Sequence, residues 1–135
     1  MRQSLAIAVM CVSLAACAVP LFPSPPGDLA ADRRACDQSY PRGVGSYLPH
    51  AQCVNAAIER DAIPFARYPD LVRLQEQLRV KYSAQIDRGA LSPRDGERRM
   101  AEADQLVTAT THDRDVGRDA VADHRVDRLE AMLQR

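Results

Sequence analysis

Apolar residues recur at helical spacing through the middle of this chain of 135 residues. The repeating positions are Leu71, Leu74, Leu78, Tyr82 and Ile86. Intervals of three and four residues place all these side chains on one face of an α-helix. Pro69 suits the first turn of such a helix, and Gly89 is typical of the position that ends one. The pattern therefore predicts a helix from about residue 69 to residue 87.

A second helix is predicted directly after the first. Ser92 and Pro93 form a start signal, because a serine side chain caps a helix N-terminus and proline fits the first helical position. Met100, Ala103 and Leu106 then repeat at helical spacing. Because only a short turn joins the two helices, we expect them to pack against each other as an antiparallel αα-hairpin.

One more helix is predicted on each side of this hairpin. A short helix over residues 50–62 precedes it and is ended by Pro64. The segment 108–117 is polar, rich in Thr and Asp, and ends in glycine, so we expect a break or kink there. A last helix over about 118–134 follows. Its apolar stripe consists of Ala122, Val126, Leu129 and Leu133.

Composition also favours helices over strands. β-Branched runs are scarce, Trp is absent, and Ala, Arg, Leu, Gln, Glu and Asp dominate. The length suits one domain. The 18 basic side chains balance the 18 acidic ones, so the charge does not indicate nucleic acid as a partner. We therefore expect a mainly α protein, a small helical body in which the αα-hairpin is preceded by a short helix and followed by a C-terminal helix.

The first residues have the features of a secretory signal. Arg2 supplies a positive charge, and the apolar stretch over residues 4–14 is too short to span a membrane. The stretch leads into Leu14-Ala15-Ala16-Cys17, which resembles the lipobox of bacterial lipoproteins. The resemblance implies that the Cys17 thiol carries a diacylglyceryl group and that the preceding peptide is removed. It also implies that the new amino terminus is acylated, with palmitate as the expected chain.

The same family pattern predicts the compartment. In these lipoproteins, Asp directly after the cysteine is typical of retention at the inner membrane. Ala18 occupies that position, so the resemblance implies an outer-membrane anchor with the body facing the periplasm. Cys11 is a poorer acceptor because the bulky Met10 precedes it. The final residue is Arg135 rather than lysine, which disfavours covalent linkage to the cell wall. The body resembles small uncharacterised helical envelope lipoproteins.

A proline-rich segment separates Cys17 from the predicted helices. It contains Pro20, Pro23, Pro25, Pro26 and Gly27, a composition typical of an extended tether. We therefore expect three regions along the chain. These are the signal peptide over 1–16, the lipidated cysteine and Pro-rich linker over 17–35, and the helical periplasmic body over 36–135.

Two further cysteines, Cys36 and Cys53, predict one disulfide in an oxidising compartment. Pro and Gly are frequent between them, so we expect a disulfide-stapled loop with little regular structure. A metal pair of His50 and Cys53 is the alternative. A zinc site needs three or four ligands, and a third partner is hard to find here. We therefore expect neither a metal nor a cofactor.

Acidic residues recur every fourth position near the C-terminus. They are Asp115, Asp119, Asp123 and Asp127. We interpret the row as a solvated helix face. With His112 and His124 it is also the candidate site for a divalent cation or a small ligand. No nucleophile elbow, phosphate-binding glycine loop or zinc-protease motif occurs in the sequence, which argues against an enzyme.

Together these patterns predict a lipid-anchored protein of the cell envelope with a non-enzymatic structural or protein-interaction function. We expect its partners to be the membrane, through Cys17, and either a second copy or another envelope protein. Self-association would cover apolar helix faces. The alternatives are a binder of a small ligand or divalent cation, and an inhibitor of a cell-wall enzyme.

Overall fold

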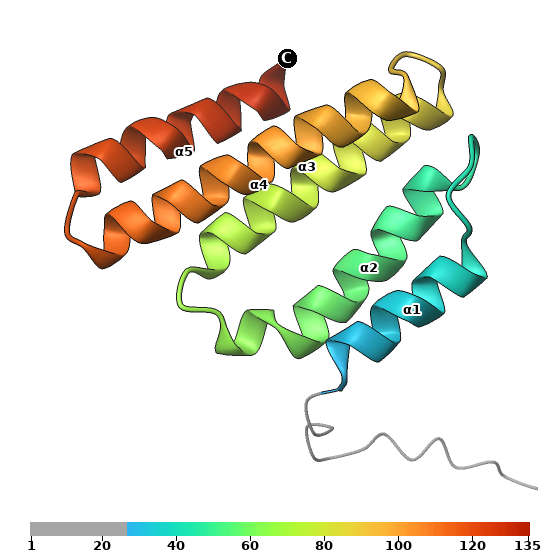
Figure 1. Ribbon diagram of the computed structural model, residues 1–135, viewed down its shortest axis with the longest axis horizontal. Coiled ribbons are helices and arrows are strands. Elements are labelled where there is room, and N and C mark those ends of the chain that lie inside the picture. Colours follow the sequence, from blue (N-terminus) through green and yellow to red (C-terminus); the bar gives the residue numbers. More distant parts are fainter. Residues whose placement is uncertain (1–26) are drawn as a thin grey trace, which may run out of the picture.

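The computed structural model describes residues 27–135 as a set of helices, with no strand in that range (Figure 1). The elements are α1 (Leu29–Ser39), α2 (Tyr47–Asp61), the short 3-10 turn η1 (Ile63–Phe65), α3 (Pro69–Asp87), α4 (Pro93–Asp115) and α5 (Asp119–Gln134). The prediction of a mainly α body is confirmed.

The helices form two groups. Helices α3, α4 and α5 pack against one another as a three-helix bundle in which successive helices run antiparallel (Figure 1). Helices α1 and α2 form a hairpin that leans on the bundle through α2, and α1 packs against α2 alone among the described helices. The hairpin and the bundle are therefore joined mainly along one interface, between α2 and α3.

Each group has its own hydrophobic core. The bundle core consists of Leu71, Leu78, Tyr82, Ala103, Leu106, Leu129 and Met132. The hairpin core is smaller and consists of Cys36, Val54, Ile58 and Ile63. Val72 reaches the hairpin core from α3. Most of the buried apolar surface therefore lies in the bundle, and the hairpin depends on a few residues.

The αα-hairpin predicted from the apolar stripe is present as α3 and α4. Gly89 has a φ of 70°, the left-handed conformation that ends a helix and that glycine adopts without strain. The Ser92 hydroxyl accepts a hydrogen bond from the Asp95 N–H at 3.1 Å and caps α4. Local signals therefore set this turn, and both helix ends lie where they were predicted.

The expected linker boundary is wrong, because the helical body begins before residue 36. The side chain of Asp28 accepts hydrogen bonds from the N–H groups of Ala30 and Ala31, at 3.0 and 3.2 Å, and caps α1. Residues 29–35, assigned to the linker, are helical. The proline-rich composition stops at Gly27, so nothing prevents a helix after that point. The signal peptide and the remainder of the linker lie outside the described residues.

The segment between the two cysteines is also more regular than expected. Cys36 lies in α1 and Cys53 in α2, so the disulfide joins two helices rather than closing an irregular loop. Helix α2 starts at Tyr47, earlier than the predicted residue 50, and includes Pro49 in its first turn. Proline is tolerated there because the first N–H groups of a helix have no partner within the helix.

The predicted break over 108–117 is confined to its last residues. Helix α4 continues to Asp115, and Gly117, with a φ of 71°, turns the chain into α5. Thr110 is fully buried, and its hydroxyl donates to the Leu106 carbonyl at 2.7 Å, which satisfies the polar group inside the helix. Asp113 is buried and forms ion pairs with two arginines, Arg118 and Arg125. Tertiary packing therefore overrides the weak helix preference of this polar stretch.

The N-terminus of α2 is capped by a residue from α3. The Asp87 carboxylate accepts hydrogen bonds from the N–H groups of Gly45, Tyr47 and Leu48, at 2.7, 3.2 and 2.8 Å. The cap residue Ser46 makes no such bond itself. Burial raises the pKa of Asp87, but the three N–H donors outweigh it and hold the pKa below its usual range. Asp87 thus fixes the loop end of the hairpin, where α1 leads into α2, to the bundle.

We expect Asp87→Ala to lower the free energy of unfolding by roughly 2 kcal/mol, because helix N-terminal donors lose a charged acceptor. The pKa of Asp87 is lower when folded than when unfolded. Its contribution is therefore present above the ordinary carboxyl pKa and is lost as the pH falls through the folded value. Urea unfolding at neutral and acidic pH measures both effects. Asp127→Ala, on the exposed face of α5, is the control; an equal loss there contradicts the assignment.

Candidate functional site

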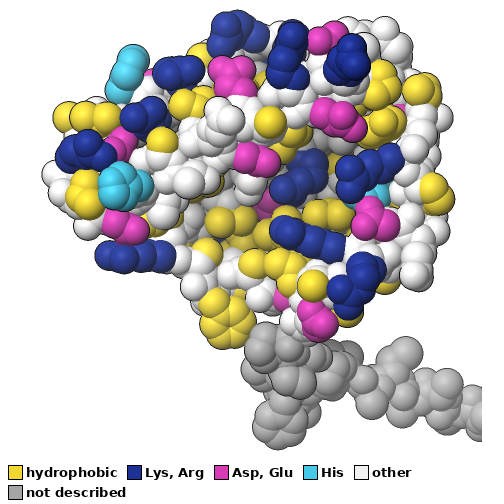
Figure 2. All heavy atoms as spheres, in the orientation of Figure 1, with side chains coloured by type: hydrophobic (Ala, Val, Ile, Leu, Met, Phe, Trp, Pro, Cys, Tyr) yellow, Lys and Arg dark blue, Asp and Glu magenta, His cyan; other side chains and the backbone are white. Residues whose placement is uncertain are grey.

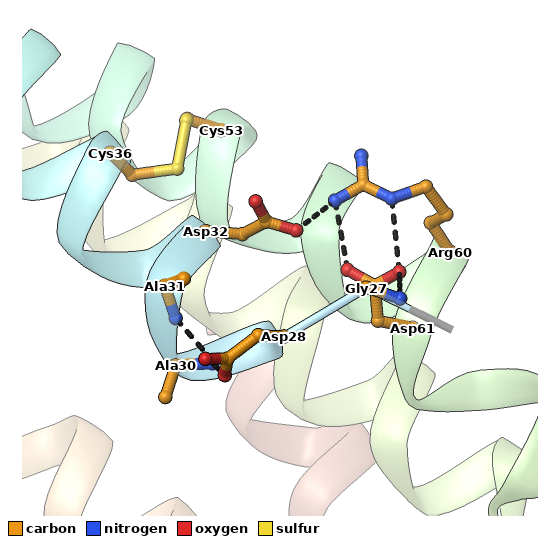
Figure 3. Close-up of polar contacts among 9 residues, drawn as sticks. All are labelled: Gly27, Asp28, Ala30, Ala31, Asp32, Cys36, Cys53, Arg60 and Asp61. Carbon is orange, nitrogen blue, oxygen red and sulfur yellow. Dashed lines mark hydrogen bonds and ion pairs between the residues drawn. A yellow bond between two sulfur atoms is a disulfide. The ribbon is translucent and has the colours of Figure 1, made fainter. Parts of the chain in front are cut away.

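The chain enters the body at a polar clamp next to the disulfide (Figure 3). The Gly27 N–H donates to Asp61 Oδ1 at 3.1 Å, and Arg60 pairs with Asp61 at 2.8 Å and with Asp32. The Asp61 side chain is buried, and its hydrogen bond with Arg60 is the main reason that its pKa is lowered. Residues from the start of α1 and the end of α2 are thereby held together where the chain enters.

The predicted disulfide lies one helical turn further along α1, beyond this clamp. The sulfur atoms of Cys36 and Cys53 are 2.02 Å apart, and the Cα atoms are 5.8 Å apart. Clamp and disulfide join the same two helices, so a force applied at residue 27 is transmitted to α1 and α2 together. Cys17, the predicted lipid site, lies outside the described residues.

A groove of about 440 Å³ opens between the hairpin and α4, with α3 at its base. Figure 2 shows this face, where hydrophobic side chains are visible in a hollow bordered by basic and acidic ones. The apolar part of the lining is Val54, Tyr82, Ile86 and Met100. An apolar hollow with a few convergent polar groups is the usual form of a ligand site. We take this hollow, the α3 groove, as the candidate functional site.

Arg79 is the basic residue at the base of the α3 groove. It is half-buried, and it donates a hydrogen bond from Nη1 to the side-chain oxygen of Asn55. Burial lowers the pKa of Arg79, and the charge of nearby Arg33 lowers it further. Within residues 27–135, neither arginine forms an ion pair with a carboxylate. The groove therefore holds positive charge that the described part of the chain leaves without a bonded carboxylate.

The other charged groups of the α3 groove are divided between its two walls. On the hairpin side, Asp37 contacts His50 at 2.8 Å and Arg42 at 3.6 Å. The bond with His50 is the main reason that the pKa of Asp37 is lowered. On the α4 side, Asp104 accepts a hydrogen bond from Gln75 at 2.6 Å, and Glu97 is exposed. The hairpin wall thus carries basic side chains together with Asp37, and the α4 wall carries acidic ones.

A second groove lies on the α2–α3 interface and has a volume of about 480 Å³. One of its residues, Glu76, is 6% exposed, and its Oε1 has no hydrogen-bond partner in the described part of the chain. Burial and then the charge of Glu59 raise the pKa of Glu76. A carboxyl group held toward its neutral form attracts a cation weakly, so this groove is the poorer candidate.

The residues that the sequence suggested as a cation site are not brought together in the structure. Asp115 lies on α4, whereas Asp119, Asp123 and Asp127 lie on α5, so the four do not form one helical row. His112 and His124 are exposed. Over residues 27–135, no group of three or more His, Cys, Asp or Glu side chains is placed to hold a metal ion. His50 contacts Asp37, and Cys53 is consumed in the disulfide.

The acidic residue that does organise this region is Asp113, which lies outside the row of aspartates that the sequence suggested. It is 2% exposed and pairs with Arg118 at 2.5 Å and with Arg125 at 2.8 Å. The hydrogen bond from Arg125 is the main reason that the pKa of Asp113 is lowered. These contacts hold α5 to α4, so the role of Asp113 is structural.

The α3 groove could not be predicted from the sequence. Its residues come from four helices and are far apart in the chain, so no local motif marks them. Arg79 stands next to the apolar stripe of α3, a position that by itself is typical of an exposed helix face. The packing of the hairpin against the bundle is what turns it into a groove residue.

Comparison with known proteins adds no relative: no family model, no curated protein and no solved structure matches the chain. Among the residues that the structure describes, no helix has the length and apolar character needed to cross a bilayer.

Proposed function

We propose that this protein is a lipid-anchored protein of the cell envelope, attached through Cys17 with its helical body facing the periplasm. The observation that carries the proposal is Leu14-Ala15-Ala16-Cys17 at the end of a short apolar signal. Ala18 after the cysteine supports the outer membrane as the destination. A single acyl chain binds a bilayer reversibly, whereas two or three hold a protein there stably.

The body is proposed to act by binding a partner rather than by catalysis. Two features support this. The α3 groove offers an apolar base with convergent polar groups, and the clamp at Gly27 ties the entering chain to α1 and α2. The partner is a component of the envelope, a second copy or another protein; nucleic acid does not suit the balanced charge.

The corrected start of the body shortens the proposed reach from the membrane. The body begins at Asp28, so residues 18–27 remain as the connection to Cys17. Ten fully extended residues span at most about 35 Å. A partner that binds the body must therefore come within that distance, plus the size of the body, of the anchoring bilayer.

We expect Cys17→Ser to abolish incorporation of a palmitate label, because the serine hydroxyl does not replace the thiol in the lipid transfer. The protein should then accumulate as an unprocessed precursor, larger by the signal peptide. Metabolic labelling followed by electrophoresis and mass spectrometry measures both effects. Cys11→Ser is the matched control and should be labelled like the unchanged protein. Continued labelling of Cys17→Ser would overturn the anchor proposal.

A further inference from the structure

We propose that the α3 groove binds a small monocarboxylate with an apolar body. The carboxylate is held by Arg79, with Arg33 beside it, and the apolar part lies on Val54, Tyr82 and Met100. This inference deepens the binding role proposed for the body and rests on it. It does not depend on the lipid anchor.

The first support is the number of free donors on Arg79. A guanidinium group has five N–H donors arranged to meet a planar oxyanion at two points. The structure shows one hydrogen bond from the Arg79 side chain, to Asn55. The half-buried setting strengthens any further charge-assisted bond, because less water competes for the charge.

The second support is electrostatic. Arg33 lines the same groove, and after burial its charge is the next cause that lowers the pKa of Arg79. The charges of Asp104 and Glu76 raise that pKa, but they offset only part of the repulsion between the two arginines. An anion placed between them relieves this repulsion and gains attraction to both. Neither arginine is paired with a carboxylate in the described part of the chain, so a ligand would not have to displace an existing ion pair there.

The third support limits the ligand to one negative charge and an apolar body. Glu97 and Asp104 on the α4 wall repel an anion with several charges, such as a nucleotide. The apolar residues at the base favour a ligand that carries hydrocarbon rather than a bare ion. A volume of about 440 Å³ falls within the usual range for small-molecule sites.

The test uses the full chain in dodecyl maltoside and two pairs of probes. Hexanoate is compared with hexanamide, and N-acetylleucine with N-acetylleucinamide, so each carboxylate has a neutral partner of nearly the same shape. Isothermal titration calorimetry gives the affinity, with titration into detergent alone as the reference. We expect the carboxylates to bind and the amides to bind at least tenfold more weakly. The two pairs distinguish an acyl source of the carboxylate from a peptide source.

Arg79→Met keeps the apolar stem and removes the charge, and we expect it to weaken carboxylate binding tenfold or more. Arg73→Met is the matched control, since Arg73 lies on α3 but is exposed and pairs with Glu59 outside this groove. It should leave the affinity unchanged. A second measurement needs no variant: modification by phenylglyoxal, read by mass spectrometry, should be slowed at Arg79 and Arg33 by hexanoate and unchanged at Arg73.

Three results would overturn the inference. They are no binding of either carboxylate at 20 mM, equal binding of carboxylates and amides, or an equal loss of affinity in Arg79→Met and Arg73→Met. If one of these results is obtained while the unchanged protein still pulls a partner down from membranes, the groove inference fails and the proposed envelope binding function stands. The two failures are therefore distinguishable.

Discussion

Removing the disulfide through Cys36→Ala and Cys53→Ala is expected to lower the free energy of unfolding by roughly 3 kcal/mol. The bond restricts the unfolded chain by closing a loop between residues 17 apart in sequence. It also lies beside the small hairpin core, to which Cys36 contributes while being 2% exposed. For a body of this size, the loss corresponds to a melting temperature lower by roughly 15 °C.

Hydrogen exchange should show where the disulfide variant becomes unstable. The hairpin core consists of few residues, and α1 contacts α2 alone among the described helices. The amides of α1 and α2 should therefore lose protection before those of α3, α4 and α5. Reduction of the unchanged protein should reproduce the same pattern. Uniform loss of protection in all five helices, or a change below 1 kcal/mol, would contradict the two-core description.

Leu78→Ala is expected to lower the free energy of unfolding by about 3 kcal/mol through a different part of the molecule. Leu78 is 0% exposed in the bundle core, and the alanine leaves a cavity that rigid neighbours fill only in part. Because the hairpin leans on α3, loss of the bundle should expose all five helices to exchange together.

Urea unfolding followed by circular dichroism measures the loss in Leu78→Ala. Val44→Ala is the matched control, since Val44 is 71% exposed and its truncation should change stability by less than about 0.5 kcal/mol. If Leu78→Ala loosened the hairpin first and spared the bundle, the assignment of Leu78 to the main core would be wrong.

The losses of stability expected in the disulfide variant and in Leu78→Ala bear on the proposed function. The hairpin is the part of the body that follows the proposed anchor directly in sequence, and it also supplies one wall of the α3 groove. A variant without the disulfide therefore tests whether binding needs the hairpin in place. The shape of the α3 groove depends on the α2–α3 interface. There the Asn55 side chain donates a hydrogen bond to the Glu76 backbone carbonyl and accepts one from Arg79.

The parts of the fold that were predicted correctly have local causes. The stripe from Leu71 to Ile86 marks α3, and Gly89 with Ser92 marks the turn into α4, because each residue acts within one or two helical turns. The disulfide followed from the pairing of the two cysteines left after Cys11 and Cys17. These features need no knowledge of which helix packs against which.

The errors arose where packing outweighs local preference. Helix α1 is polar and has one buried residue, Cys36, so its sequence shows no stripe of large apolar side chains like that of α3. The start of α2 depends on Asp87, which is distant in the chain. The polar end of α4 stays helical because Thr110 and Asp113 find partners inside the folded body.

The helical class, the central αα-hairpin and the cysteine pair could be predicted from the sequence, which is also the sole support for the proposed anchor at Cys17. Periodicity and capping are properties of neighbouring residues, so a single chain reveals them. Three features come from the packing of the helices instead: two helices lean on the other three, Asp87 caps α2 from a different helix, and Arg79 lies at the base of a groove. Those features depend on which faces meet, and spacing along one chain does not record that.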